Sequence, residues 1–162
     1  MSGDPSRVRI ADERDEEALF ELCQFLHGEN GIFTMSEPAV RAVLRKAIIG
    51  PVEMRRGIVG VIGERNDLHG AIFLEIGSQW YSDDISLAEL FNYVYPQHRK
   101  TSASNDLIAF AKKMSDHFGV PLMIGVLSNT RTEAKVRLYR KQLGEPVGAF
   151  FLHGATTGRG VH

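Results

Sequence analysis

The sequence contains a single cysteine, Cys23, so no disulfide can form within the chain and no cysteine pair is present to hold zinc. Its 162 residues carry a formal net charge of −1, which excludes the global positive field that gathers nucleic acid. This cysteine usage fits a reducing compartment, and we expect a cytoplasmic protein with no nucleic-acid partner.

Other common signatures are also missing. No apolar run approaches the roughly 20 residues that a helix needs to cross a bilayer. The stretch from Met1 to Pro5 is polar and lacks the apolar core of a signal peptide. HExxH, P-loop, GxSxG and RNA-recognition motifs are absent, and the histidines show no ligand spacing with carboxylates. We therefore expect no membrane partner and no metal.

The composition that remains is typical of a globular domain, with 43% hydrophobic and 24% charged residues. The length suits one domain, and neither a repeat nor a linker divides the chain. We predict a single domain over residues 1–154. The segment 155–162 is small, polar and rich in glycine, and it is predicted to be a flexible C-terminal tail.

Hydrophobic periodicity and breaker residues predict ten elements along the chain. They are a strand at 8–10, a helix that Asp12 or Asp15 caps and Gly28 ends, a helix capped by Ser36 with Pro38 in its first turn, strands at 57–63, 71–76 and 87–95, a helix at 104–118, a strand at 122–127, a helix at 132–143 and a strand at 148–152.

The predicted order is β-α-α-β-β-β-α-β-α-β, an α+β pattern in which a meander precedes a β-α-β unit. The run 122–127 is almost wholly apolar, which predicts a strand buried on both faces. The helix 104–118 is expected to pack Leu107, Ala111, Met114 and Phe118 onto the sheet. In the helix 132–143, the residues expected to face inward are Ala134, Leu138 and Tyr139.

The segment from Tyr93 to Ser104, with the sequence YVYPQHRKTSAS, resembles the GNAT N-acetyltransferase superfamily. In that family a hydrophobic-proline strand end precedes an Arg/Gln-x-x-Gly-x-Gly/Ala loop and a helix. Here Arg99 matches the first position, and Ser102 and Ser104 match the two glycine positions. The resemblance spans roughly residues 8–152, and its C-terminal part looks most like GNAT-like proteins carried by phages.

The resemblance implies a GNAT fold, in which a mixed central sheet has a splayed central strand and helices on both faces. It implies an N-acetyltransferase that moves an acetyl group from acetyl-CoA to a primary amine by direct attack. Matching positions give the residues expected to bind acetyl-CoA, which are Tyr93, Val94, Tyr95, Arg99, Lys100, Thr101, Ser102, Ala103, Ser104 and Asn129.

The loop also has a physical logic of its own. Unpaired N–H groups at a helix start, aligned with the positive end of the helix dipole, form an anion site suited to a pyrophosphate. Glycine is common there because the ligand approaches the backbone closely. The serines at 102 and 104 either add hydroxyl donors or only cap the helix, so a phosphate loop and a plain capped helix start both stand.

Two residues are candidates for the chemistry of amine acetylation. Tyr139 resembles the family's helical tyrosine and would protonate the departing thiolate, or else it packs the helix on the sheet. Glu89 lies on the central strand and would accept the amine proton, with a pKa raised by an apolar cleft, or else it faces solvent. Glu75 and Asp84 are weaker alternatives.

The sequence leaves the biological role open in several respects. A catalytically silent GNAT-like module that binds CoA weakly, or binds a protein partner, is the alternative to an enzyme. A third reading is an unrelated α+β protein whose helix start binds another phosphate. The amine acceptor is unidentified. The cationic run from Arg131 to Lys141 is either a solvated face or a source of phosphate contacts. The segment Gln79-Trp80-Tyr81 fits an acceptor pocket, a core or a dimer contact, so a homodimer is also open.

Overall fold

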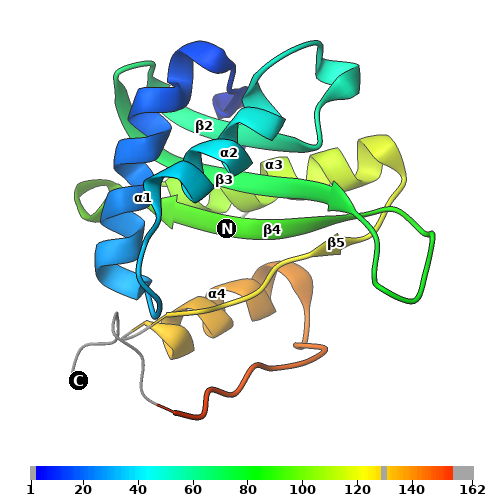
Figure 1. Cartoon of the computed structure of the whole chain (residues 1–162). Helices are drawn as coiled ribbons and strands as arrows, with labels where there is room; N and C mark the ends of the chain where they lie inside the picture. Colours follow the sequence, from blue (N-terminus) through cyan, green and yellow to red (C-terminus); the bar gives the residue numbers. More distant parts are fainter. Residues whose placement is uncertain (1–2, 129–130, 155–162) are drawn as a thin grey trace.

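The computed structural model describes residues 3–128 and 131–154, and its strands form one sheet in the order β1-β2-β3-β4-β5 (Figure 1). The α+β class is confirmed, and so is the predicted element order as far as the last helix. In chain order the elements are β1 (Arg9–Ile10), α1 (Glu16–Asn30), α2 (Glu37–Ile48), β2 (Gly57–Glu64), β3 (Asp67–Gly77), β4 (Ser86–Val94), α3 (Ala103–Phe118), β5 (Leu122–Met123) and α4 (Thr132–Leu143).

The sheet is mixed, as predicted. Strands β1 to β4 pair antiparallel with their neighbours, whereas β5 pairs parallel with β4. The β4–β5 ladder joins Leu87 to Leu122 and Ala88 to Met123, and no further pair follows in the described part of the chain, although β4 continues to Val94. The predicted splay is therefore present, because β4 continues paired with β3 but without β5 on its other edge.

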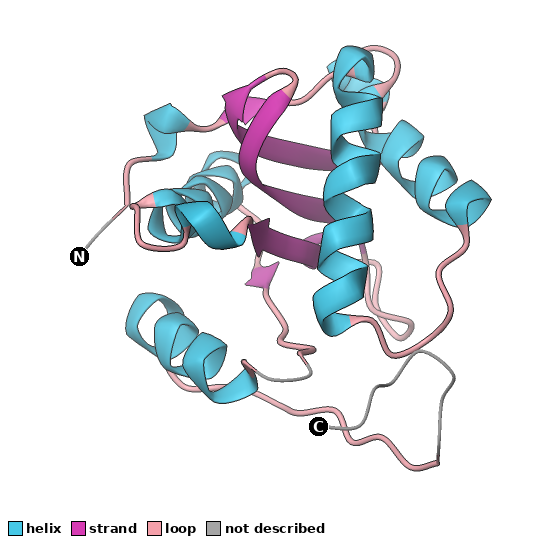
Figure 2. Cartoon of the chain, turned by 90° about the vertical axis from the view of Figure 1, so that its left-hand side faces the viewer, coloured by secondary structure: helices cyan, strands magenta, loops and turns pink. Residues whose placement is uncertain are grey.

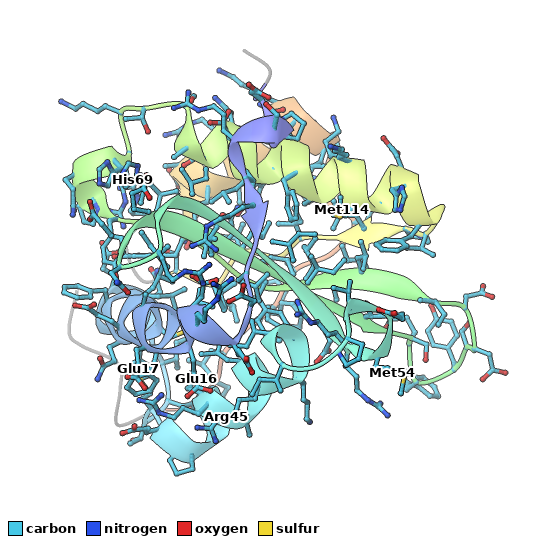
Figure 3. The ribbon with its side chains drawn as sticks, turned by 90° about the horizontal axis from the view of Figure 1, so that it is seen from above. Glu16, Glu17, Arg45, Met54, His69 and Met114 are labelled. Carbon is cyan, nitrogen blue, oxygen red and sulfur yellow. The ribbon has the colours of Figure 1, made fainter. Side chains whose placement is uncertain are left out.

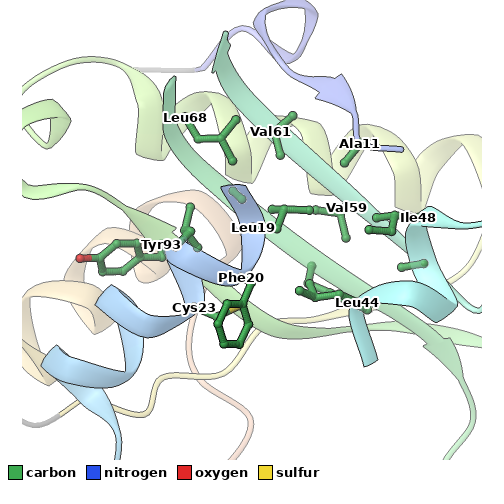
Figure 4. Packing of buried hydrophobic residues seen from close by; sticks show 14 residues of the cluster. Ala11, Leu19, Phe20, Cys23, Leu44, Ile48, Val59, Val61, Leu68 and Tyr93 are labelled. Carbon is green, nitrogen blue, oxygen red and sulfur yellow. The ribbon is translucent and has the colours of Figure 1, made fainter. Parts of the chain in front are cut away.

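Helices cover both faces of the sheet. Figure 2 shows α1 and α2 on one face and α3 on the other. Leu19, Leu44 and Val59 belong to the core cluster under α1 and α2, part of which Figure 4 shows. Leu107, Phe110 and Ile72 belong to the second cluster, beneath α3. These two apolar layers hold β4 rigidly from both sides, which fixes the strand that the site is built on.

Local signals account for some of the helix boundaries. The Ser36 hydroxyl accepts a hydrogen bond from the backbone N–H of Ala39 at the start of α2, as predicted. Gly119 ends α3 in the left-handed region with φ 65°, where glycine carries no steric penalty. The prediction that Gly28 ends the first helix was wrong, because α1 continues to Asn30. Glycine inside a helix costs only about 1 kcal/mol, which tertiary packing readily offsets.

Charged side chains join the two helices on the same face. Arg45 of α2 donates two hydrogen bonds to Glu16 of α1, and Arg41 of α2 bridges Glu16 and Glu17. Figure 3 shows Glu16 and Glu17 on the side of α1 that faces Arg45. Because this network shares one half-buried arginine among several carboxylates, it orients α1 and α2 more firmly than an isolated surface pair.

The two C-terminal strand predictions need correction. Strand β5 covers only Leu122–Met123, and its residues alternate between half-buried and exposed rather than being buried on both faces. It is an edge strand that pairs with β4 at two positions only. The residues after Met123 therefore have no strand to pair with and do not continue β5. Residues 148–152 form no strand and run below α4, away from the sheet (Figure 1). Apolar composition favours a strand, but a strand also needs a partner edge, and none lies beside this segment.

Two predicted inward-facing residues are also exposed. Leu107 and Ala111 of α3 are fully buried and Met114 packs partly against the sheet, as predicted, but Phe118 is 51% exposed in the last turn. Ala134 of α4 is exposed, while Leu138 and Tyr139 are half-buried. Helix α4 buries no residue completely, because it borders the splayed edge rather than a face of the sheet.

No helix within residues 3–128 and 131–154 is long and apolar enough to cross a membrane. The same residues contain no group of three or more histidine, cysteine, aspartate or glutamate side chains that could hold a metal ion.

Candidate functional site

A cleft of about 230 Å³ opens where β4 departs from β5. It lies between β4, the start of α3 and the inner side of α4. The described residues that line it are Asn30, Asn92, Tyr93, Val94, Arg99, Thr101, Ser104, Asn105, Arg131, Ala134, Lys135, Leu138 and Tyr139. Three of them are cationic and none carries a carboxylate. The sequence predictions of Tyr93, Val94, Arg99, Thr101, Ser104 and Tyr139 therefore meet in one place.

The strand β4 provides one wall of this cleft. On its other edge Tyr93 pairs with Ala71 and Val94 pairs with Gly70 of β3, so the edge towards β5 is the one left without a ladder. A bulge at Leu90 shifts the register between Glu89 and Phe91 just after β5 ends. Because a bulge increases the local twist, it helps to turn β4 away from β5.

Tyr95 lies elsewhere. Its backbone N–H donates to the carbonyl of His69, and its ring meets Phe25 edge-on at 5.4 Å. It lines a separate hollow on the side of α1, beside Glu21. Burial, with the negative charge of Glu21, raises the pKa of Tyr95 to about 12. The ring of Tyr95 also meets the ring of Tyr93 edge-on at 5.6 Å. Tyr95 is therefore next to one predicted acetyl-CoA residue, but it does not line the cleft itself.

Arg99 is held firmly at the edge of the cleft. Its Nε donates to the carbonyl of Val94 at 2.9 Å, and its Nη2 pairs with Glu29 of α1. The guanidinium also lies over the ring of Tyr93, 5.4 Å from the centroid. These contacts fix the position of the guanidinium before any ligand arrives.

The loop after Arg99 leads into α3 in a conformation that needs no glycine. Ser102, the residue before the helix, has φ −75°, and no non-glycine residue described has positive φ. Thr101 accepts a hydrogen bond from the N–H of Ala103, while Ser104 lines the cleft. Lys100 is exposed outside the lining, and Ala103 is buried against the sheet.

Ser102 faces away from the cleft. Its hydroxyl donates to Asp106 at 2.8 Å and accepts from Arg7 at 3.1 Å. Asp106 is only 1% exposed and also accepts from the backbone N–H of Asp4. The hydroxyl of Ser102 therefore anchors the N-terminal segment to α3, a role that the local sequence pattern did not reveal.

Glu89 bridges the splay. Its Oε2 accepts a hydrogen bond of 3.2 Å from the backbone N–H of Gly125, across the gap where the β4–β5 ladder has ended. Burial raises the pKa of Glu89 to about 7, while this hydrogen bond and the positive charge of Lys135 oppose the rise. The rise expected from the sequence is confirmed in direction, and it brings the carboxyl near half-ionisation at neutral pH.

Tyr139 of α4 reaches β4 across the cleft. Its hydroxyl accepts a hydrogen bond of 3.0 Å from the side-chain amide of Asn92. Burial, together with the negative charge of Glu89, raises the pKa of Tyr139, and the hydrogen bond from Asn92 opposes this. The tyrosine therefore keeps its proton at neutral pH.

Sequence reasoning did not single out Asn92, and it considered Arg131 and Lys135 only as members of a cationic run that is either solvated or in contact with phosphate. For the last two a signal existed, because Arg131, Lys135 and Tyr139 recur every four residues and so share one face of α4. Asn92 lacked such a signal, since its importance depends on the residue opposite. Asn129, predicted to contact the acetyl-CoA arm, lies outside the described residues.

The segment Gln79-Trp80-Tyr81 is not part of a core. Trp80 is 94% exposed and Tyr81 72% exposed, at the loop between β3 and β4. The two rings meet edge-on at 5.4 Å. This exposure excludes one of the three roles considered for the segment.

No protein-family model matches the sequence, and no curated protein matches it closely. Solved structures do match. An integron cassette protein from a Cole Harbour salt-marsh metagenome is 19% identical with a TM-score of 0.71, covering 94% of this chain and 92% of its own. A possible acetyltransferase from Clostridium difficile is 15% identical with a TM-score of 0.68, covering 91% and 96%.

A third structure is AAC(6')-Iy in complex with the bisubstrate analogue CoA-S-monomethyl-acetylneamine. It is 12% identical with a TM-score of 0.68, covering 91% of this chain and 95% of its own. At these identities the likeness concerns the fold. The chain has the fold of GNAT acetyltransferases, as the sequence resemblance predicted.

Proposed function

We infer that the cleft binds an acyl-CoA and that the chain transfers its acetyl group to a primary amine. The observation that carries this inference is the charge of the cleft, in which three cationic residues and no carboxylate line the described walls. An acyl-CoA brings a strongly anionic pyrophosphate to one end and an uncharged thioester to the other. A cationic cleft that narrows between two diverging strands suits such a ligand.

The start of α3 suits the pyrophosphate. The first N–H groups of a helix have no acceptor within the helix. Here the N–H of Ala103 donates to the Thr101 hydroxyl, and the next residue, Ser104, lines the cleft. Arg99 stands beside this helix start with its Nε on the Val94 carbonyl and its Nη2 paired with Glu29. Its position is therefore fixed at little cost in side-chain entropy, and a phosphate there would share the guanidinium with the Glu29 carboxylate. Lys100 and Ser102 remain proposed neighbours of the phosphates through the loop backbone. Ala103 remains a proposed neighbour by its position only, because its N–H already donates to Thr101.

The open edge of β4 suits the pantetheine arm. An extended ligand can add to an exposed strand edge through backbone hydrogen bonds. Tyr93 and Val94 line the cleft on that edge, which β5 has left. Asn129 is proposed for the far side of the arm, in keeping with the family resemblance.

The chemistry needs a neutral amine and a proton for the leaving sulfur. Glu89, with a pKa near neutrality, is suited to accept the amine proton, directly or through water. Tyr139 accepts a hydrogen bond from Asn92, which leaves its own hydroxyl hydrogen to donate to the departing thiolate. Tyr139 lines the cleft from α4, whereas Glu89 comes from β4 just outside the described lining.

A second candidate function is acyl-CoA binding without catalysis. It is favoured by the contacts that both proton-transfer groups already make, since Glu89 bridges to Gly125 and Tyr139 pairs with Asn92. For transfer to occur, the Glu89 bridge must open when the ligand enters the splay.

A transfer assay separates these functions. The chain is incubated with acetyl-CoA and a panel of primary amines, and release of the CoA thiol is followed together with the mass of each amine. The enzyme predicts thiol release that depends on one class of amine and is lost in Tyr139→Phe. Calorimetric binding of acetyl-CoA without acetylation of any amine supports the silent binder instead.

A further inference from the structure

Helix α4 presents a lysine to the cleft. Arg131 at the N-cap and Lys135 and Tyr139 in the helix follow one another at four-residue intervals, and all three line the cleft on one side of α4. Lys135 is half-buried there, whereas Arg137 and Lys141 of the same helix are exposed. Among the residues that line the described cleft, Lys135 is the only lysine.

The groups around Lys135 set its reactivity. Burial lowers the pKa of the Lys135 amine, and the positive charges of Arg131 and Arg99 act in the same direction, while Glu89 and Glu29 oppose them. A lower pKa leaves a larger neutral fraction at a given pH. The neutral amine is the form that attacks a carbonyl.

We propose that Lys135 is itself an acceptor, so that the chain acetylates this side chain from acetyl-CoA bound in the same cleft. The inference rests on the proposed function, because it needs the thioester to lie between β4 and α4. Lys135 stands one helical turn from Tyr139, the group assigned to the leaving sulfur. It is also close enough to Glu89 of β4 for the charge of that carboxylate to act on the amine.

The reaction balances without any further reactant. The neutral Nζ of Lys135 attacks the thioester carbonyl carbon, so that a C–N bond forms and the C–S bond breaks. Glu89, or solvent, accepts the proton that the nitrogen loses, and the sulfur gains a proton from Tyr139 or solvent. The products are an amide on Lys135 and the free CoA thiol.

The modification would reduce further binding. Acetylation removes one of the three positive charges that line the cleft and adds bulk beside Tyr139. The acetylated chain therefore binds acyl-CoA more weakly. Self-acetylation in this form inhibits the transfer activity when acetyl-CoA is abundant and the external amine is scarce.

The experiment incubates the full chain with acetyl-CoA near neutral pH without added amine, and follows intact mass and mapped peptides with time. Lys113, which is exposed on α3, serves as the internal control. We expect one acetyl group on Lys135, gained about a hundredfold faster than on Lys113 because the bound thioester is held nearby. The rate should saturate with acetyl-CoA and should not depend on protein concentration.

Two further samples complete the test. In urea-unfolded chain, Lys135 should react no faster than Lys113. The Lys135→Arg variant keeps the charge and removes the nucleophile, so it should bind acetyl-CoA and gain no preferred acetyl group. If calorimetry shows acetyl-CoA bound to the folded chain and Lys135 still reacts no faster than Lys113, the inference is overturned while the proposed function stands. If acetyl-CoA does not bind, the proposed function itself fails.

Discussion

The side-chain amide of Asn92 on β4 donates a hydrogen bond of 3.0 Å to the hydroxyl of Tyr139 on α4. This contact joins the two walls of the cleft at the point where β4 has lost β5 as a partner. It orients the tyrosine through its acceptor lone pair and leaves the hydroxyl hydrogen available. The geometry that makes Tyr139 a candidate acid is thus supplied by a residue on a different element.

Tyr139→Phe tests this assignment. The change removes one hydroxyl, so the fold and acetyl-CoA binding should survive, with a loss of about 1 kcal/mol in the free energy of unfolding. Turnover should fall by about 10²-fold, measured as thiol release at saturating acetyl-CoA. Tyr81→Phe makes the same chemical change at an exposed ring and should leave turnover unaltered. Full turnover in Tyr139→Phe, with chemistry rate-limiting, would make Tyr139 a packing residue.

Glu89→Gln should change the pH dependence of the reaction. A general base must be ionised, and the pKa of Glu89 is raised to about 7. The wild-type rate should therefore climb with pH through this value, and the variant should lack the climb. The two rates should differ least at low pH, where Glu89 is protonated, and most above its pKa. Glu75→Gln, at an exposed position of β3, is the matched control, and its rate should still increase with pH as in the wild type. An unchanged profile in Glu89→Gln would exclude Glu89 as the base.

The same carboxyl should make stability depend on pH. Its pKa rises from 4.5 to about 7 on folding, so the folded chain holds the proton more tightly than the unfolded chain. The free energy of unfolding then falls as pH increases across this window and levels off above it. Relative to Glu89→Gln, the wild type should lose about 2–3 kcal/mol between pH 4 and pH 8 in urea unfolding. A constant difference between the two chains across this range would show that Glu89 is well solvated.

Ser102→Ala and Ser104→Ala should differ in their effect on stability, although the two serines lie close together in the chain at the start of α3. Ser102 connects the buried Asp106 to Arg7, so its removal should cost about 1–3 kcal/mol in urea unfolding. Ser104 lines the cleft in the first turn of α3, where alanine is well tolerated, so the fold should keep its stability. Equal stability of both variants would mean that the Asp106 network does not depend on the Ser102 hydroxyl.

Much of the fold follows from local sequence. The caps and breakers at Ser36 and Gly119 mark helix ends because they act on neighbouring backbone, and the burial of Leu107 follows from helical spacing. The C-terminal strand at 148–152 was predicted wrongly because its formation depends on a distant edge, which no local pattern records. Phe118 was misplaced for a related reason, since its helix outruns the sheet beneath it.

The site was predictable in part for the same reasons. The loop that opens α3 follows from a motif, so Arg99, Thr101 and Ser104 could be named in advance. The partners of the site residues could not be named, because Glu29 of α1 pairs with Arg99 and Asn92 of β4 donates to Tyr139, and each pair is far apart in the chain. Ser102 shows the limit most clearly, as its motif position suggests the phosphate while its hydroxyl faces the N-terminal segment.

The most direct measurement is calorimetric titration of acetyl-CoA into the wild type and two charge reversals on α4. Both arginines are exposed, but Arg131, the N-cap residue of α4, lines the cleft, whereas Arg137 lies within the helix and outside the lining. We expect saturable 1:1 binding to the wild type, a loss of about tenfold or more in affinity for Arg131→Glu, and a change of less than about twofold for Arg137→Glu. Absence of wild-type binding, or equal losses in the two variants, would contradict the assignment of this cleft to an acyl-CoA.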